Sequence, residues 1–415
     1  MKVILLHPTG NRNVRAVMEG LASAGMLAEF NTTLSADPAA SWLKLMPKGM
    51  SQEWLRRTFP VPADQIWTSP LLEIARIALP KLGWRSCAEH EHGWASLDAV
   101  YHQLDRAAAR RLPRLAQKRK ANAVYAYEDG ALATFTQAKQ LGMTCVYDLP
   151  IAFWETTRRL LTEEAERLPG WAPTLGGGIL DSPAKLERKT RELELADVVV
   201  GPGQFVLNSL PPWAKGKQLV MAPFGSPRKL DPMEANESAE KGKSNRPLRV
   251  LFAGAMGQRK GLGDLFAAVR LLNRSDIELV VMGSLLAPME FYHEALPNFT
   301  HEPGRSNEQV LALMRSCDVF CLPSIVEGRA LVMQEAMSQG LPLIITPNTG
   351  GADLIQEGKT GFLVPIRSPE AIANKLTWFL ENRAQIPEMG RNAQEHAASY
   401  TWENYGAQIV ESLSS

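Results

Sequence analysis

Cysteines are scarce in this chain, and none of them forms a Cys-x-x-Cys pair. The 415 residues contain four: Cys87, Cys145, Cys317 and Cys321. Cys317 and Cys321 sit in an apolar run that has the composition of a strand. A disulfide framework needs regularly spaced cysteines in an oxidising compartment. The pattern instead predicts buried free thiols in a reducing cytoplasm.

Long hydrophobic runs and an excess charge of one sign are also missing. No stretch of 18 apolar residues occurs, so no transmembrane helix is predicted. The opening MKVILLHPTG carries one lysine and an apolar run that is too short for a signal peptide and suits a buried strand. With 45 basic and 44 acidic residues the net charge is +1, which provides no field for nucleic acid. We expect a cytoplasmic protein without a nucleic-acid partner.

Two common nucleotide-binding motifs are absent. An NAD-binding domain has Gly-x-Gly-x-x-Gly after its first strand. The turn HPTGNRN lacks these glycines, and GLGDLF near residue 263 lacks the third. The triplet Gly358-Lys359-Thr360 resembles the end of a P-loop, but position 353, where the first glycine belongs, is Asp353. The sequence therefore argues against a dehydrogenase and a P-loop NTPase.

Short apolar runs alternate with amphipathic helical patterns along the whole chain. This alternation predicts parallel sheets covered by helices, which is an α/β fold. The pattern starts twice, at Met1 and again near Arg249, so we predict two Rossmann-like domains. The expected strands are Val3–Leu6, Ala28–Leu34, Ala123–Tyr127, Thr144–Leu149, Asp197–Val200, Leu248–Ala253, Ile277–Met282, Asp318–Leu322, Leu341–Thr346 and Gly361–Val364.

The boundary between the two domains is predicted from composition. Gly225–Pro247 is polar and charged, with few large apolar residues, as in a linker or an exposed loop. We expect an N-terminal domain over residues 1–222, a linker over 223–247 and a C-terminal domain over 248–397. A last helix at about 398–415 is expected to pack back onto the N-terminal domain.

Two segments of the first domain have unusual composition. Residues 42–94 contain five tryptophans, which can stack on sugars, sit at a membrane surface or fill a core beneath long loops. In Arg106–Lys120 a basic residue recurs every fourth position, which suits contact with anionic lipid or a solvated helix face. Pro113 is expected to break or kink this stripe.

The segment PSIVEGRALVMQEAM carries two acids eight residues apart, Glu327 and Glu335. A buried strand precedes it, and Arg329–Gln339 has helical composition, with Gly340 suited to a C-terminal cap. Glu327 therefore falls in the loop before a helix, and Glu335 about two turns into it. Each carboxylate can accept two hydrogen bonds from a vicinal diol. The alternative is one acid stabilising the helix dipole and one surface acid.

A basic turn stands at the start of the second domain, in FAGAMGQRKGLGDLF. A strand ends at Gly254, Arg259 and Lys260 follow, and a helix begins near Gly261. Two cations at a helix N-terminus after a strand suit a diphosphate. A basic turn on the surface is the alternative.

Together, FAGAMGQRKG, PSIVEGRALVMQEAMSQGLPLIITPNTGGADLI and EGKTGFLVP resemble the retaining family 4 glycosyltransferases of the GT-B fold. The resemblance is dense over 248–365, and ELELADVVVGPGQFVLNSL with VMAPFG is similar to that family's domain-joining region. It implies two facing domains with a cleft between them, the donor held by the C-terminal domain and the acceptor by the N-terminal one. It also implies a hexosyltransferase-type enzyme that uses a UDP- or GDP-sugar in polysaccharide or glycoconjugate synthesis, with a saccharide, lipid-linked or small-molecule acceptor.

The resemblance assigns roles to matching positions. Glu327 should contact the donor sugar, Glu335 the ribose, and Arg259 with Lys260 the diphosphate, and the catalytic set is Glu327, Arg259 and Lys260. Backbone N–H groups at 328–331 should bind sugar hydroxyls and phosphate. The whole expected donor site is Gly10, Asn11, Gly254, Arg259, Lys260, Gly304, Arg305, Glu327, Gly328, Arg329, Ala330, Leu331, Val332 and Glu335. No metal or other cofactor is expected, because the family generally needs none and the chain has no Asp-x-Asp motif.

The chain departs from the family pattern at several positions. Ala255 stands where many relatives have arginine, and Arg329 and Ala330 replace Phe-Gly, which places a charge beside the expected sugar site. Many relatives also carry a histidine in the N-terminal domain near the donor sugar, but no histidine lies between His102 and His293 in this chain. Acids at strand ends are acceptor-side candidates for that role: Glu128, Asp129 and Asp148, each of which also suits a cap or turn. These departures leave a non-catalytic, nucleotide-sugar-binding relative as the alternative.

Overall fold

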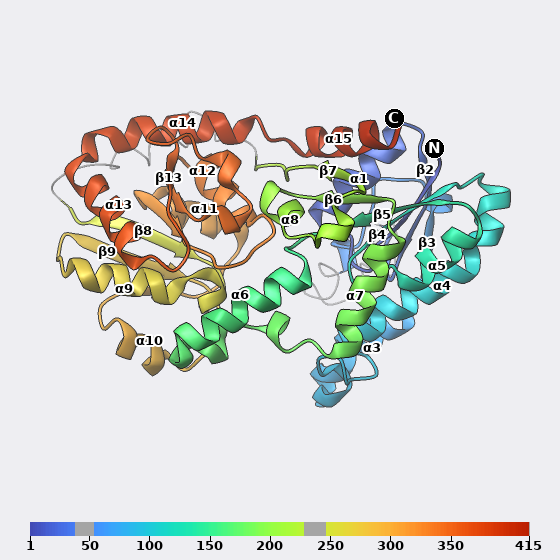
Figure 1. The fold of residues 1–415 in the computed structure, drawn as a ribbon, viewed down its shortest axis with the longest axis horizontal. Coiled ribbons are helices and arrows are strands. Elements are labelled where there is room, and N and C mark those ends of the chain that lie inside the picture. Colours follow the sequence, from blue (N-terminus) through green and yellow to red (C-terminus); the bar gives the residue numbers. More distant parts are fainter. Residues whose placement is uncertain (38–53, 228–245, 415) are drawn as a thin grey trace.

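The computed structural model describes residues 1–37, 54–227 and 246–414. Most of the predicted linker, and Trp42 of the tryptophan-rich segment, lie outside these residues. The described chain forms two lobes, each built on a parallel sheet between helices (Figure 1). The N and C termini lie close together on the N-terminal lobe (Figure 1).

The N-terminal sheet has seven described strands in the order β3-β2-β1-β4-β5-β6-β7, all parallel. Its central strands are buried along their whole length, as parallel strands covered on both faces must be. Their bounds are β1 Val3–Leu6, β2 Leu27–Thr32, β3 Ile66–Thr68, β4 Ala123–Tyr127, β5 Thr144–Asp148, β6 Val198–Gly201 and β7 Gln218–Met221.

The C-terminal sheet has six described strands in the order β10-β9-β8-β11-β12-β13, again all parallel. Phe252 and Phe320 are fully buried in its core, and each contributes about 1.5–3 kcal/mol by burial. The bounds are β8 Leu248–Ala253, β9 Ile277–Met282, β10 Thr300–Glu302, β11 Val319–Leu322, β12 Leu343–Ile345 and β13 Gly361–Leu363.

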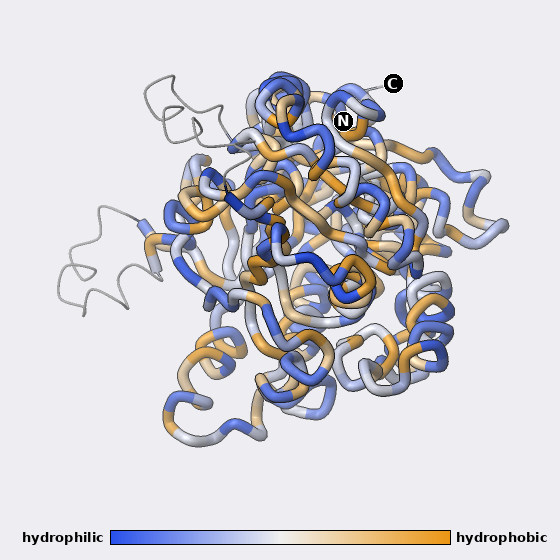
Figure 2. Tube along the Cα trace, turned by 90° about the vertical axis from the view of Figure 1, so that its left-hand side faces the viewer, coloured by the Kyte–Doolittle hydropathy of each residue, from blue (hydrophilic) through white to orange (hydrophobic). Residues whose placement is uncertain are grey.

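Helices cover both sheets. Along the helices polar and apolar residues alternate, as expected where one face of a helix packs on a sheet (Figure 2). Their bounds are α1 Arg12–Ser23, α3 Leu71–Ala78, α4 Leu97–Lys118, α5 Leu132–Gln140, α6 Trp154–Arg167, α7 Pro183–Leu195, α8 Gln204–Asn208, α9 Leu262–Leu272, α10 Met289–Ala295, α11 Asn307–Arg315, α12 Leu331–Ser338, α13 Pro369–Glu381, α14 Ile386–Ala398 and α15 Trp402–Ser414.

The ten expected strands are present, with ends shifted by up to a few residues, and the two-sheet α/β prediction is confirmed. The sequence missed β3, β7 and β10, which are all edge strands. Edge strands are short and partly exposed, so they lack a continuous apolar run: β10 is Thr-His-Glu, and only one residue of β7 is buried. Pro113 was expected to break or kink the basic stripe. The break does not occur, since α4 runs through this residue, and the kink stays a prediction.

The last helix, α15, returns from the C-terminal lobe and lies against α1 (Figure 1). Tyr405, Ile409 and Leu413 join the apolar cluster on that face of the N-terminal sheet. The two helices approach closely because Gly20 faces Gly406. A Cβ on Gly406 would lie 2.6 Å from the Ala16 carbonyl oxygen.

The basic stripe of α4 is exposed on the surface, at Arg106, Arg110, Arg114 and Lys118. Its contact with a membrane stays a prediction. None of the helices in the described ranges combines the length and apolar composition that a membrane crossing requires.

Candidate functional site

Each sheet has one point where its strand order reverses. In the C-terminal sheet this point lies between β8 and β11, and in the N-terminal sheet between β1 and β4. Loops that leave the carboxyl ends of strands at such a point form the usual ligand site of an open α/β sheet. The turn of Arg259 and Lys260 follows β8, and the loop of Glu327 follows β11. The sheet topology therefore brings together two motifs that are 67 residues apart in the sequence.

Glu327, Arg259 and Lys260 form one charged cluster at this point. Oε1 of Glu327 lies 2.6 Å from Lys260 Nζ and 3.0 Å from Arg259 Nη1. The Ile325 N–H donates to the Arg259 carbonyl oxygen at 2.9 Å, which ties the two loops together along the backbone. Two cations share one carboxylate, so the cluster has one excess positive charge and suits an anion.

The two lobes touch beside this cluster. A Cβ on Gly328 would lie 1.7 Å from the carbonyl oxygen of Pro150, which follows β5. A Cβ on Gly203, which follows β6, would lie 2.5 Å from the carbonyl oxygen of Gly350. Glycine is required at these positions because backbone from the opposite lobe occupies the space of a side chain. The loops at the carboxyl ends of both sheets therefore face each other.

The helix after Glu327 begins at Leu331, two residues later than expected. Glu335, four residues further on, lies about one turn into α12, where the eight residues from Glu327 had suggested about two. Glu335 Oε1 lies 3.4 Å from the Asn307 amide nitrogen, and partial burial raises the pKa of its carboxyl. Leu331 and Val332 form the first turn of α12. The Ala330 N–H already donates to the Thr349 carbonyl oxygen at 3.3 Å, which removes one of the expected sugar-binding groups.

The other expected donor positions lie at the ends of strands or in the loops that follow them. Gly254 follows β8 and packs on Lys260, whose Cδ would lie 2.7 Å from a Cβ there. Gly10 and Asn11 follow β1, where Asn11 is the N-cap of α1 and makes no side-chain capping bond. Gly304 and Arg305 lie in the exposed loop between β10 and α11, and Arg305 pairs with Glu302.

Arg329 corrects one expectation. Its side chain is fully buried, so its guanidinium does not present a charge to a ligand on the surface. The guanidinium donates to both Asp353 carboxylate oxygens at 2.7 and 3.0 Å, and to the Gly350 carbonyl oxygen at 3.0 Å. It also lies 4.9 Å from the ring centroid of Tyr400. Because this charge is neutralised inside the C-terminal lobe, only the backbone of Arg329 remains for a ligand.

Asp148 corrects a second expectation, that it faces the acceptor. Asp148 is the last residue of β5 and is 1% exposed. It accepts a hydrogen bond from Tyr125 Oη at 2.5 Å. Burial raises its pKa to about 7. Asp148 lies between the N-terminal sheet and Tyr405 of α15, so it contributes to packing in the core and not to a surface that faces the acceptor.

Glu128 and Asp129 do lie at the carboxyl end of β4, beside the reversal point of the N-terminal sheet. Glu128 is 9% exposed, its Oε1 has no hydrogen-bond partner, and its other oxygen lies 3.5 Å from Lys189 Nζ. Burial raises the pKa of Glu128 to about 7. Asp129 has a left-handed backbone, with φ 75°, and pairs with Arg188 at 2.6 Å. Both acids remain acceptor-side candidates.

His7 is a residue that the sequence analysis missed. It directly follows β1, and its Nδ1 accepts from the N–H groups of Thr9 and Gly10 at 3.1 and 2.9 Å. This arrangement places the proton of the neutral ring on Nε2. Burial and the nearby charge of Arg57 lower its pKa to about 3. The signal that could have identified it is a polar residue placed directly after an apolar strand.

The turn that carries Arg259 and Lys260 is held by the opposite lobe. Gln258 donates from Nε2 to Glu164 at 2.7 Å, and its N–H donates to Thr174 Oγ1 at 3.0 Å. Glu164 lies in α6, which extends from the N-terminal lobe across to the other (Figure 1). Glu164 is fully buried and also accepts from Arg167 at 2.5 Å and Arg367 at 2.8 Å. One carboxylate therefore connects both lobes to the basic turn.

Replacing Glu164 with alanine is expected to lower the free energy of unfolding by about 1–3 kcal/mol, because Gln258, Arg167 and Arg367 each lose one of the two carboxylates that they contact. Urea denaturation followed by circular dichroism measures the change. Glu163→Ala is the matched control: this neighbour pairs with Arg367 at 2.9 Å, but its side chain is 39% exposed, so a change below about 1 kcal/mol is expected. Equal effects of the two substitutions would contradict a bridging role for Glu164.

The two facing lobes define a GT-B fold, and solved structures agree. Sucrose-phosphate synthase from Thermosynechococcus elongatus superposes with a TM-score of 0.63 at 17% identity, over 99% of this chain and 98% of that one. Anabaena Alr3699/HepE in complex with UDP and glucose has a TM-score of 0.60 at 16% identity, and all of both chains is covered. At these identities the likeness concerns the fold.

Residues 233–396 match the family described as glycosyl transferases group 1. D-inositol 3-phosphate glycosyltransferase of Paenarthrobacter aurescens is 28% identical over 261 residues, which is 56% of this chain. This match covers 62% of the length of that relative. Matches to two further proteins of the same name cover 25% and 41% of their lengths.

Proposed function

We propose that this chain is a hexosyltransferase-type glycosyltransferase that transfers a sugar from a nucleotide-diphosphate donor to a hydroxyl acceptor. The observation that carries the proposal is the cluster in which Glu327 lies between Arg259 and Lys260 at the reversal point of the C-terminal sheet. An incoming diphosphate replaces Glu327 as the partner of the two cations. Glu327 is then free to accept hydrogen bonds from the donor sugar.

The same cluster supports a reaction with retention and without a metal ion. The acceptor oxygen bonds to the anomeric carbon while the bond from that carbon to the phosphate oxygen breaks on the same face. The acceptor proton passes to the leaving phosphate, and Arg259 and Lys260 stabilise the charge that develops there. No carboxylate nucleophile is then required.

A UDP-sugar is the favoured donor, because the Anabaena neighbour of the same fold was solved in complex with UDP and glucose. Saccharide, lipid-linked and small-molecule acceptors all fit the proposal, as does a role in polysaccharide or glycoconjugate synthesis. A non-catalytic relative that only binds the nucleotide-sugar is the second candidate.

Nucleotide binding tests the proposal directly. UDP at one hundred times its dissociation constant should stabilise the protein by about 2.7 kcal/mol, and the melting temperature should rise by several degrees. GDP at the same concentration should shift it less. No shift with any nucleoside diphosphate at millimolar concentration would contradict the donor site. Binding of UDP without release of UDP from any UDP-hexose would favour the non-catalytic relative.

A further inference from the structure

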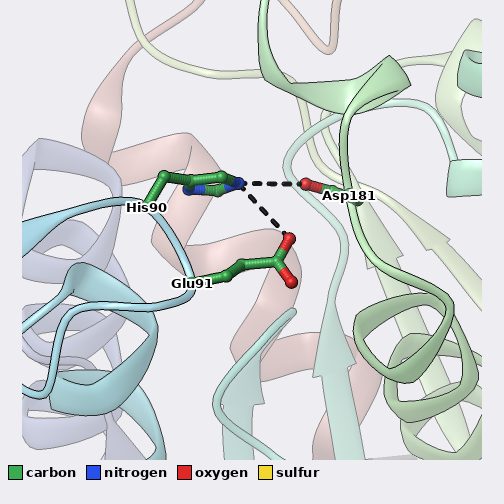
Figure 3. Close-up of side chains that lie close together, drawn as sticks. All are labelled: His90, Glu91 and Asp181. Carbon is green, nitrogen blue, oxygen red and sulfur yellow. Dashed lines mark ion pairs between the residues drawn. The ribbon is translucent and has the colours of Figure 1, made fainter.

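We infer that His90, Glu91 and Asp181 form a binding site for a zinc ion in the N-terminal lobe. The inference is independent of the proposed function and concerns a different part of the molecule. The three side chains come from two separate segments and point toward one another (Figure 3). His90 and Glu91 lie in the loop before α4, and Asp181 lies just before α7.

The spacing of the three groups matches the ligands of one ion better than hydrogen bonds. His90 Nε2 lies 3.4 Å from Glu91 Oε1 and 3.5 Å from Asp181 Oδ1. Zinc binds imidazole nitrogen and carboxylate oxygen at about 2.0–2.2 Å, so neighbouring tetrahedral ligands lie about 3.3–3.6 Å apart. An imidazole that donated to either carboxylate would instead approach to about 2.7–2.9 Å.

The groups behind these ligands would hold them in place. Asp98 Oδ2 lies 3.7 Å from His90 Nδ1, on the far side of the ring, where zinc-binding histidines usually face a carboxylate. The Ser182 N–H donates to Glu91 Oε1 at 3.1 Å. Glu91 itself has a left-handed backbone, with φ 58°, which is costly for a residue other than glycine. This conformation directs its carboxylate to the cluster.

Lysines near Asp181 offer another source of positive charge. Lys185 Nζ lies 3.4 Å from Asp181 Oδ1 and closer, at 2.9 Å, to Asp98, and Lys189 Nζ lies 3.4 Å from Asp181 Oδ2. The carboxylates along α7 are Glu91, Asp98, Glu128, Asp129, Asp181 and Glu192, and the cations that face them are Lys185, Arg188, Lys189 and Arg158, whose Nη2 donates to the Asp181 carbonyl oxygen at 2.7 Å.

Burial raises the pKa of Glu128 to about 7 and that of Glu192 to about 8. With both of these acids protonated, four carboxylates face four cations. The spacing of His90, Glu91 and Asp181, and not an excess of negative charge, therefore points to the ion.

The ligand set decides the kind of ion and its role. One imidazole and two carboxylates suit Zn²⁺ better than Mg²⁺, which prefers oxygen ligands and retains several waters. Because the His90 side chain is 53% exposed, the fourth position would be open to solvent. The ion would tie the loop before α4 to the N-terminus of α7.

Titration of chelator-treated, full-length protein with zinc tests the inference. Wild type should bind one Zn²⁺ per chain, and zinc should raise its melting temperature. His90→Gln and Asp181→Asn, which keep the size of each side chain, should each weaken binding at least tenfold. His92→Ala is the matched control, because this exposed histidine lies two residues from His90 and outside the cluster.

Three results would overturn the site. One is the absence of binding at millimolar zinc, another is binding that both His90→Gln and Asp181→Asn leave unchanged, and the third is loss of binding in His92→Ala alone. Melting curves in the chelator check that the variants fold. Cobalt added in place of zinc gives an absorption band in the visible range when its ligands are tetrahedral, and this band should disappear in His90→Gln.

Discussion

Glu327→Gln is expected to lower the turnover number for sugar transfer by about 100- to 1,000-fold, the range seen when one preorganised polar group is removed from an active site. The amide keeps the shape of the side chain but removes the charge that faces Arg259 and Lys260 at 3.0 and 2.6 Å. Binding of UDP should change little or become tighter, because the diphosphate no longer competes with a carboxylate for the two cations. Steady-state kinetics and calorimetric titration with UDP measure the two effects separately.

Glu357→Gln is the control for this substitution. Glu357 lies in the same lobe and pairs with Lys375 at 3.3 Å, but its side chain is 58% exposed. Its removal should leave both turnover and UDP binding unchanged. Transfer at the wild-type rate by Glu327→Gln would remove Glu327 from the catalytic set. A large loss of UDP affinity instead would mean that Glu327 serves mainly to hold the nucleotide site together.

Lys260→Ala is expected to weaken UDP binding by about 10- to 100-fold, because a hydrogen bond to a charged group contributes about 1.5–3 kcal/mol and each 1.4 kcal/mol is tenfold. Lys260 is 14% exposed at the side chain, so its charge is only partly screened by solvent. Arg259 remains next to Glu327 and keeps part of the anion site. Calorimetric titration with UDP at two salt concentrations checks the loss, which should be smaller at high salt.

Lys359→Ala serves as the matched control, because Lys359 is an exposed lysine of the same lobe. It also lies in the Gly-Lys-Thr triplet that resembles the end of a P-loop. An unchanged dissociation constant for Lys260→Ala would show that the diphosphate binds elsewhere. A loss of UDP binding in Lys359→Ala would show that the triplet contacts phosphate after all.

The order of elements was predictable because strands buried on both faces carry continuous apolar runs. The edge strands β3, β7 and β10 were not, since an edge residue is exposed and needs no such run. The loop of Glu327 was placed correctly before a helix, because Gly340 and Pro342 mark the end of that helix. The start of α12 was predicted two residues early, which is about half a turn of the helix.

The role of a side chain could not be predicted from the sequence where it depends on a partner far along the chain. Arg329 stands beside Glu327 in the sequence, yet its guanidinium turns to Asp353, and only the packing of the loop after β12 decides this. Asp148 ends a strand as a ligand-binding acid often does, but Tyr125 and α15 enclose it. The sequence offered no sign that Glu164 in the first half would hold Gln258 in the second.

Local patterns thus determined the two α/β halves and the presence of an acidic loop and a basic turn at strand ends, because burial and helix capping act within a few residues. Only the tertiary structure brought Glu327 to Lys260, closed Pro150 onto Gly328 and set His90 opposite Asp181. Lys260 and Glu327 are 67 positions apart in the sequence, and Pro150 and Gly328 are 178 positions apart. They depend on strand order and on how one lobe meets the other, and neither is encoded in the spacing of a motif.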